Sequence, residues 1–276
     1  MTKLQASNFS LYLQRLGYDR PPAPTLETLR HLQPRHTVAF PFETLSTMLH
    51  DEVPIDLPSL EHKILHAGRG GYCYELNNLF LALLLQLGFD ARGITGSVVM
   101  GGSEDEHKAR THMLILVTLN GVRYIVDVGF GGMVPTSPLL LDTEDEQPTG
   151  HEPYRLTLHD GSYTLRAQVA GDWRALYVFD LQTQGPIDYE VGNWYVSTHQ
   201  NSPFLGQLVV ARTGAGLRRT LNNGSYAIHR IGAKSERWQF TEVDVVIDLL
   251  QNEFGIRMPQ HPQLRNILER VITLSF

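Results

Sequence analysis

The hydrophobic periodicity of the chain changes near residue 90, and this change limits the folds that the chain can adopt. Before that point apolar residues recur at helical spacing, most clearly from Tyr74 to Leu87, where they form one buried face and Gly88 is placed to end the helix. From about Arg92 onward the spacing becomes that of strands, while the last third mixes strands with two helical patterns. The predicted strands cover residues 96–100, 111–119, 122–128, 154–159 and 162–170. The expected order of elements is therefore helical, then antiparallel β, then mixed.

Composition and charge narrow the classes of function. With 276 residues, of which 42% are hydrophobic, the chain can bury a substantial core divided between two or three parts. A net charge of -6 at pH 7 argues against broad binding to nucleic acid or to an anionic membrane, because both need concentrated lysine and arginine. The N-terminus has no apolar signal core, and no apolar run is long enough to span a bilayer. We therefore expect a soluble protein with no nucleic-acid or membrane partner.

A single cysteine, Cys73, lies in the segment RGGYCYELN at the predicted start of the strongest helix. One cysteine can form neither an internal disulfide nor a thiolate-rich zinc site, and this usage favours a reducing, cytoplasmic compartment. The free amides and the positive dipole end of a helix N-terminus favour thiolate over thiol, so Cys73 could be a nucleophile. It could equally be a small buried apolar residue, because free cysteines are among the most buried side chains. A general base beside it would decide between the two.

A predicted β-hairpin supplies such a base. Asn120 and Gly121 form the preferred two-residue turn, so facing residues of the two strands lie symmetrically about this pair. The register places Leu114 opposite Asp127 and makes His112 and Asp127 diagonal neighbours on one face, with backbones about 7–8 Å apart. An imidazole and a carboxylate are costly on an apolar face unless they satisfy each other. The hairpin therefore predicts a His–Asp pair, either as a structural hydrogen bond or as part of a catalytic group.

Cys73, His112 and Asp127 have the residue types of a nucleophile, a base and an orienting acid, in the order used by papain-like cysteine enzymes. In such an arrangement His112 would hold Cys73 as a thiolate–imidazolium pair, and Asp127 would fix the imidazole tautomer. The amide of Cys73 could also donate to an oxyanion.

Several motifs resemble one family, the arylamine N-acetyltransferases. RGGYCYELN is similar to the nucleophile motif of that family, THMLILV to the strand that carries its histidine, and YIVDVGFGG to the strand and glycine turn that carry its aspartate. Three further stretches agree, namely YLQRLGY (12–18), HTVAFPFETL (36–45) and NWYVSTHQNSPF (193–204). The chain departs from the family pattern at Gln200, where proline is frequent, and at Ser97, where arginine is frequent. These departures bear on acceptor preference and loop shape rather than on the reaction.

The resemblance implies an α+β multi-domain fold with a cysteine-protease-like catalytic core. A helical bundle over residues 1–90 would carry Cys73, an antiparallel β-barrel-like domain over 91–203 would carry the histidine and the aspartate, and an α/β lid would cover 204–276. The resemblance also implies that acetyl-CoA acetylates Cys73 and that an arylamine or arylhydrazine then takes the acetyl group in a ping-pong cycle. Acetyl-CoA would be a co-substrate, and no cofactor would be permanently bound.

Other site residues follow from the resemblance alone. Glu43 and Arg69 resemble a charged pair beside the nucleophile, for which we expect a supporting salt bridge. Coenzyme A would contact the glycine-rich turn, and the candidate residues are Gly131, Gly132 and Thr111. An apolar acceptor pocket would be lined by Phe42, Val98, Phe130 and Phe204, each of which would otherwise be plain core. The basic residues Arg212, Arg218 and Arg219 could meet the phosphates of coenzyme A, but a solvated basic face is the simpler interpretation.

Two other functions are compatible with the same residues. A cysteine peptidase or a transglutaminase-like acyl transferase would use the same Cys, His, Asp order, and a non-enzymatic binding protein or scaffold would hold a structural thiol beside a His–Asp strut. The remaining histidines show no metal-ligand spacing, so we predict no metal. The acidic segment 141–153 is predicted to be a solvated loop.

Overall fold

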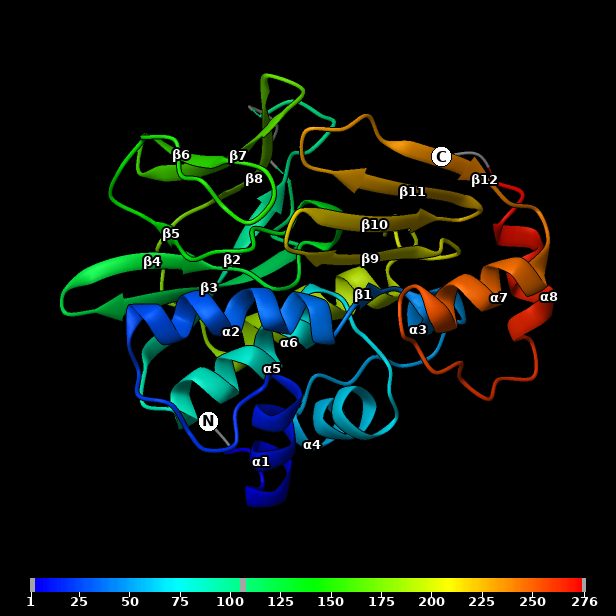
Figure 1. Cartoon of the computed structure of the whole chain (residues 1–276), viewed down its shortest axis with the longest axis horizontal. Coiled ribbons are helices and arrows are strands. Elements are labelled where there is room, and N and C mark those ends of the chain that lie inside the picture. Colours follow the sequence, from blue (N-terminus) through cyan, green and yellow to red (C-terminus); the bar gives the residue numbers. More distant parts are fainter. Residues whose placement is uncertain (1–2, 105–107, 275–276) are drawn as a thin grey trace.

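The computed structural model describes residues 3–104 and 108–274, and the N-terminal part of the chain is helical (Figure 1). The helices are α1 (Ala6–Arg15), α2 (Leu26–Ala39), α3 (Leu45–Met48), α4 (Leu57–Leu60) and α5 (Cys73–Gln86), with a π-helical stretch at Glu61–His66. Helix α5 is the most deeply buried of them, because its leucines pack on several sides. It is followed by Gly88, whose positive φ of 90° lets the chain turn away from the helix.

A seven-stranded antiparallel sheet follows and curves into a barrel-like layer (Figure 1). Its strands lie in the order β5-β4-β3-β2-β8-β7-β6. They are β2 (Asp90–Val98), β3 (His112–Leu119), β4 (Val122–Val126), β5 (Leu139–Leu140), β6 (Tyr154–His159), β7 (Ser162–Val169) and β8 (Asp172–Phe179).

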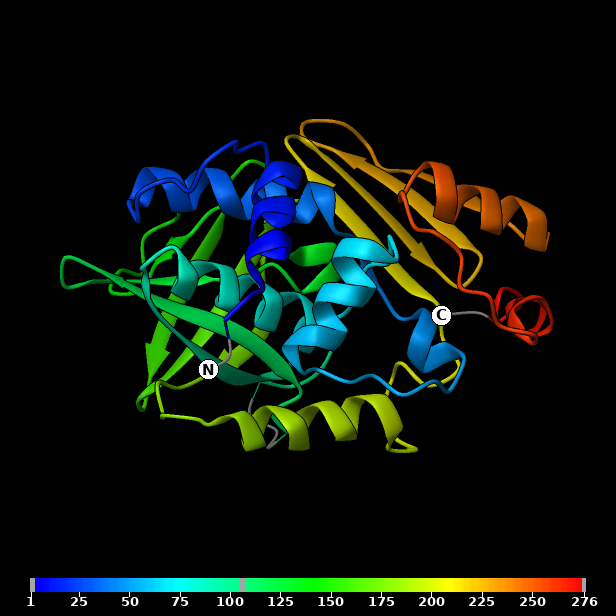
Figure 2. The ribbon, with the colours of Figure 1, turned by 90° about the horizontal axis from the view of Figure 1, so that it is seen from below.

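A second, five-stranded antiparallel sheet has the order β1-β9-β10-β11-β12. Its strands are β1 (Phe42–Glu43), β9 (Val209–Gly214), β10 (Leu217–Asn222), β11 (Ser225–Arg230) and β12 (Glu236–Gln239). Helices α7 (Val243–Asn252) and α8 (Leu264–Val271) lie at its far end, while α6 (Pro186–Thr198) runs along another edge of the molecule (Figure 2). Strand β1 comes from the helical region and pairs with β9, so it ties the beginning of the chain to this sheet.

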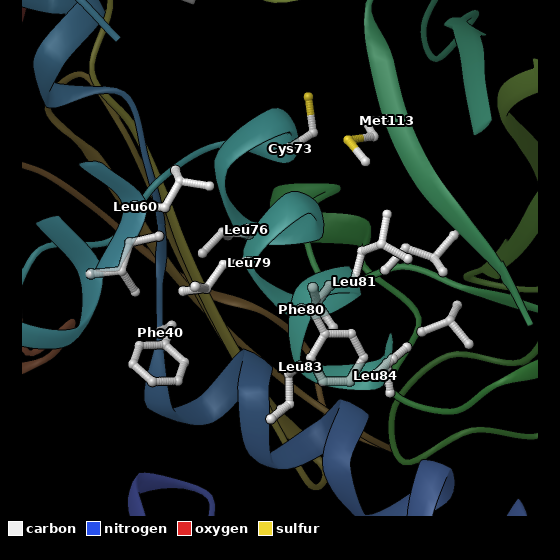
Figure 3. Close-up of a cluster of buried hydrophobic side chains, with 14 of the residues drawn as sticks. Phe40, Leu60, Cys73, Leu76, Leu79, Phe80, Leu81, Leu83, Leu84 and Met113 are labelled. Carbon is white, nitrogen blue, oxygen red and sulfur yellow. The ribbon is translucent and has the colours of Figure 1, made fainter. Parts of the chain in front are cut away.

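Three groups of buried apolar side chains form the core. The first surrounds α5 and includes side chains of α1, α2 and β3, and Figure 3 shows the row of α5 leucines and Phe80 within it. The second lies between the five-stranded sheet, α7, α8 and α3, and the third fills the barrel-like sheet. No helix in the described parts of the chain is long and apolar enough to cross a membrane.

The expected fold class is confirmed, with helices first, a barrel-like antiparallel sheet next and a sheet with helices last. The division at residues 90 and 203 stays a prediction. Strand β1 and helix α3 pack with the C-terminal sheet although they belong to the segment expected as a helical bundle.

The β3–β4 hairpin has the predicted turn, with positive φ at Asn120 (51°) and Gly121 (80°). Its register also agrees with the prediction as far as the pair Ile115–Val126. The expected continuation to a pair between Leu114 and Asp127 is wrong, because β4 ends at Val126. The reason lies in a side chain of α5, described below.

Candidate active site

Cys73 is the first residue of α5, and its side chain is 4% exposed. Glu75 fixes the start of this helix, since its Oε2 accepts a hydrogen bond from the amide of Tyr72 at 3.1 Å. The sulfur of Cys73 is directed away from the leucine cluster (Figure 3) and lies 3.6 Å from the carbonyl oxygen of Thr111. Helix α5 therefore presents the thiol to the loop that leads into β3.

His112 opens β3 and lies between the thiol and a carboxylate. Its Nε2 is 2.7 Å from Oδ2 of Asp127, and its imidazole is close enough to the side chain of Cys73 for the two groups to interact. Both members of the His–Asp pair are buried, at 2% and 0% exposure. The structure thus brings together all three residues that the sequence singled out, and their catalytic role stays a prediction.

Asn77 lies one turn after Cys73 on α5 and enters the hairpin where the β3–β4 ladder stops. Its Nδ2 donates to the carbonyl oxygen of Met113 (2.8 Å) and to Oδ1 of Asp127 (3.0 Å), and its Oδ1 accepts from the amide of Val128 (3.1 Å). Met113 and Val128 would form the next hydrogen-bonded pair of the hairpin, so the side-chain amide takes over the bonds of that pair. The two strands separate at this point and hold the carboxylate against α5.

The segment that follows β4 approaches α5 so closely that only glycine fits at position 129. A Cβ on Gly129 would lie 2.7 Å from Cα of Cys73 and 2.7 Å from Nδ2 of Asn77. The amide of Gly129 donates to Oδ1 of Asp127 at 2.8 Å. The glycine therefore allows the close contact and also binds the carboxylate.

Four hydrogen bonds from described residues hold the Asp127 carboxylate in its charged form. Oδ1 accepts from Asn77 and Gly129, and Oδ2 accepts from His112 and from the hydroxyl of Tyr177 at 3.1 Å. Burial alone would raise the pKa of Asp127, but the charge and hydrogen bond of His112, with the other donors, lower it. The site therefore holds a buried carboxylate that stays ionised.

The same pair favours a protonated imidazole. Burial alone would lower the pKa of His112, but the negative charge of Asp127, its hydrogen bond and the Cys73 side chain raise that pKa to about 10. An imidazolium beside a sulfur at a helix start is the environment in which a thiolate is stabilised. The geometry can therefore hold an ion pair of the kind that makes cysteine a nucleophile.

Glu43 and Arg69 form the expected ion pair behind the nucleophile loop. Nε of Arg69 lies 2.9 Å from Oε1 of Glu43, and the other carboxylate oxygen accepts from the amide of Leu45 at 2.6 Å. Burial alone would raise the pKa of Glu43, but Arg69, Lys63 and this amide lower it below its usual value. Their supporting role is consistent with this position and stays a prediction.

The four aromatic and aliphatic residues expected at an acceptor pocket lie in two groups around the triad. Phe42 and Phe204 contact each other with ring centroids 5.9 Å apart, and Phe204 also contacts Tyr72 at 6.1 Å, next to the nucleophile. Phe130 lies 4.9 Å from the imidazole of His112. Val98 pairs across β2 and β8 with Tyr177, whose ring also contacts the imidazole.

The glycine-rich turn 131–133 lies between the two sheets. Gly131 has a positive φ of 71° and is packed beside the ring of Phe42, and a Cβ on Gly132 would lie 3.1 Å from the methyl group of Thr220 in β10. Gln33 of α2 binds the chain on both sides of this turn, because its Nε2 donates to the carbonyl oxygens of Asp127 (3.1 Å) and Pro135 (2.8 Å).

Two surface interpretations are corrected by the structure. Arg218 is 5% exposed and pairs with Glu152 at 2.6 Å, so it is not part of a solvated basic face. Arg219 pairs with Glu253 at 2.7 Å. The Arg218–Glu152 pair draws the end of the acidic segment 141–153 against the five-stranded sheet, and His151 is buried there. The segment is therefore only partly solvated.

Three residues of the site were missed by the sequence interpretation, namely Gln33, Asn77 and Tyr177. A signal existed for Asn77, because it lies four residues after Cys73 and therefore on the same helical face. In the described residues no group of three or more His, Cys, Asp and Glu side chains has the arrangement of a metal site.

Comparisons with known proteins agree with this geometry. A family model described as N-acetyltransferase matches residues 25–262. The arylamine N-acetyltransferase of Mycolicibacterium smegmatis is 42% identical over 249 residues, which are 89% of this chain and 90% of that protein. The crystal structure of a variant of the Mycobacterium smegmatis N-arylamine acetyltransferase has a TM-score of 0.92 at 39% identity, covering 96% of this chain and 99% of the other. The Mycobacterium marinum arylamine N-acetyltransferase in complex with CoA has a TM-score of 0.90 at 37% identity, covering 95% and 99%.

Proposed function

The chain belongs to the arylamine N-acetyltransferase family, and we propose that it transfers an acetyl group from acetyl-CoA to the nitrogen of arylamines or arylhydrazines through a thioester on Cys73. The observation that carries this proposal is the position of His112, whose imidazole contacts both the Asp127 carboxylate and the Cys73 side chain. A buried imidazole shared in this way can stabilise a thiolate and can also carry a proton between substrates.

In the first half-reaction the thiolate of Cys73 attacks the carbonyl carbon of acetyl-CoA. A carbon–sulfur bond forms to Cys73, the bond to the coenzyme A sulfur breaks, and the leaving thiolate takes a proton from His112. The amide of Cys73, at the start of α5, would stabilise the oxyanion of the tetrahedral intermediate. Asp127 remains charged and keeps the imidazole in one orientation throughout.

In the second half-reaction the neutral amine attacks the acetyl thioester. The now neutral imidazole of His112 accepts the proton of the amine, the carbon–nitrogen bond forms, and the thiolate of Cys73 leaves. The product is the N-acetylated amine, and the thiolate–imidazolium pair is restored. One histidine therefore serves both half-reactions, and dividing the transfer in two gives two easier steps.

We also propose places for the two substrates. The acceptor ring would lie against Phe42, Val98, Phe130 and Phe204, where flat apolar side chains converge on the triad. Coenzyme A would pass the glycine turn at Gly131 and Gly132 and also Thr111, whose carbonyl oxygen lies 3.6 Å from the Cys73 sulfur. We place the protein in the cytoplasm, where its single thiol stays reduced.

Incubation with acetyl-CoA tests the proposal. One acetyl group should be added to the protein on Cys73, and an added arylamine should remove it and yield the acetylated amine, as followed by intact-protein mass spectrometry. Cys73→Ser should keep its far-UV circular dichroism spectrum and lose turnover, because a serine hydroxyl gains little from the same ion pair. An unmodified Cys73 after incubation, or hydrolysis of peptide amides in place of acetyl transfer, would overturn this function.

A further inference from the structure

Gln33 of α2 binds the chain that runs from the His–Asp pair through the glycine turn. Its side chain is completely buried, and its Nε2 donates to the carbonyl oxygens of Asp127 and Pro135. One NH2 group carries two protons, so it can donate to both carbonyl oxygens at once. A single amide from a helix 94 residues earlier in the chain therefore joins the two residues that flank segment 128–134.

Segment 128–134 carries contacts for both parts of the proposed reaction. At its start, the amide of Gly129 binds the Asp127 carboxylate. Further on, Gly131 and Gly132 form the turn at which we place coenzyme A. The first half of the segment therefore serves the triad, and the second half serves the thioester substrate.

The two halves are also held by different contacts. At the start, the amide of Val128 donates to Oδ1 of Asn77 on α5 at 3.1 Å. Toward the end, the hydroxyl of Tyr154 donates to the carbonyl oxygen of Met133 at 3.0 Å, and Gln33 binds the chain two residues later. If the amide of Gln33 were lost, α5 would still hold the start of the segment, whereas the end would lose one of these two bonds.

We propose that Gln33 is a positioning residue for coenzyme A, because it holds the glycine turn in the conformation that the thioester substrate meets. This inference rests on the proposed function. A turn that is already ordered in the free protein adds no ordering cost when its ligand binds. Without the two bonds of Gln33 that cost would fall on the binding of coenzyme A, while the proposed triad would keep its contacts with α5.

Gln33→Met tests the inference, because methionine is also unbranched and has no donor for the two carbonyl oxygens. The KM for acetyl-CoA and the dissociation constant of coenzyme A, measured by isothermal titration calorimetry, should rise about tenfold, which is the factor that one neutral hydrogen bond supplies. The kcat and the rate of Cys73 alkylation by iodoacetamide should stay near the wild-type values. Unchanged coenzyme A affinity, or an equal loss in kcat and in alkylation rate, would overturn the inference.

Thr37→Val is the matched control. Thr37 lies one turn further along α2, is also buried, and its hydroxyl donates to the carbonyl oxygen of Thr213 in β9 at 2.9 Å. This variant removes a comparable bond between α2 and a distant segment but leaves both bonds of Gln33 in place. It should keep the wild-type affinity for coenzyme A. An equal loss of affinity in both variants would assign the effect to α2 as a whole and would overturn the inference.

Amide hydrogen exchange in the free protein gives a second measurement that needs no activity. The amide of Val134 donates to the carbonyl oxygen of Gly131 at 3.3 Å, whereas the amide of Val128 is held by Asn77. In Gln33→Met, exchange at Val134 should become faster than in wild type while exchange at Val128 stays the same, because only the end of the segment loosens. An unchanged rate at Val134 would contradict the role of Gln33.

Gln33→Asn covers the case in which Gln33→Met does not fold. Asparagine keeps a donor but is one methylene shorter, so its amide can reach at most one of the two carbonyl oxygens, and exchange at Val134 should again become faster. A wild-type exchange rate in this variant would reject the inference. Failure of acetyl-CoA to acetylate Cys73 in the wild-type protein would instead reject the proposed function, so the two failures are distinguishable.

Discussion

His36 is buried and has no hydrogen-bond partner in the described part of the chain, so acid should destabilise the protein partly through this residue. It lies on α2 at 0% exposure, and neither ring nitrogen has a hydrogen-bond partner among the described residues. Its neighbours are the rings of Tyr12, Phe40 and Phe80, with centroids 5.8, 5.0 and 5.0 Å away. Burial lowers the pKa of His36 from 6.5 to about 3.

The sign and size of the effect follow from these two values. The unfolded chain binds a proton at His36 below pH 6.5, whereas the folded chain does not bind it until about pH 3, so stability is lost as pH falls through that window. At pH 5 the difference amounts to about 2 kcal/mol, with almost none of it present at pH 7. Acid therefore stabilises the unfolded state through this one side chain.

The assay compares urea unfolding at pH 7 and pH 5 by far-UV circular dichroism. Wild type should lose about 2 kcal/mol more than His36→Phe between the two pH values, because phenylalanine fits the aromatic surroundings and binds no proton. His159→Gln is the control, since His159 is 91% exposed and its removal should leave the wild-type difference. Equal losses in wild type and His36→Phe would refute the reasoning and would mean that His36 has a polar partner in solution.

Two further predictions concern the support of the nucleophile. Gly129→Ala should destabilise the protein by about 1–3 kcal/mol and slow the alkylation of Cys73 by iodoacetamide, because the new Cβ would lie 2.7 Å from Cα of Cys73. Gly185→Ala is the control and should have neither effect, because its Cβ would have only Asp188 within 4.0 Å. Equal behaviour of the two variants would contradict the close packing at Gly129. Glu43→Gln should lower the free energy of unfolding by urea by about 3 kcal/mol, because the guanidinium of Arg69, which is 10% exposed, would lose its carboxylate partner. An unchanged unfolding midpoint would show that the ion pair gives no support.

The β3–β4 hairpin shows how far local sequence rules extend. The Asn120–Gly121 turn fixes the register of its own strands, and the predicted pairs are confirmed up to Ile115–Val126. The rule fails at the next step because Asn77, from a distant helix, takes the bonds of the following pair. His112 and Asp127 still meet, but the helix brings them together and not the ladder.

The other differences between the sequence predictions and the structure also arise from contacts between segments that are distant in the sequence. Tyr177 lies in a strand whose alternation is that of ordinary core, so nothing in its local sequence separates it from Tyr154. Arg218 was interpreted from its basic neighbours, yet its charge is neutralised by Glu152, which comes from another part of the chain. Residue type and spacing predict elements and candidate chemistry, whereas pairings between distant segments depend on the tertiary structure.

The proposed nucleophile, Cys73, and its proposed base, His112, belong to different layers of the molecule, and this has a consequence for synthesis on the ribosome. Cys73 emerges from the ribosome before His112, at the start of β3, and Asp127, just after β4, have been made. Until the hairpin forms and docks on Asn77, the sulfur of the nascent chain has no imidazole beside it. If these residues act as proposed, acyl transfer can begin only when the tertiary structure is complete, and it should end if the hairpin separates from the helix, even while every helix remains intact.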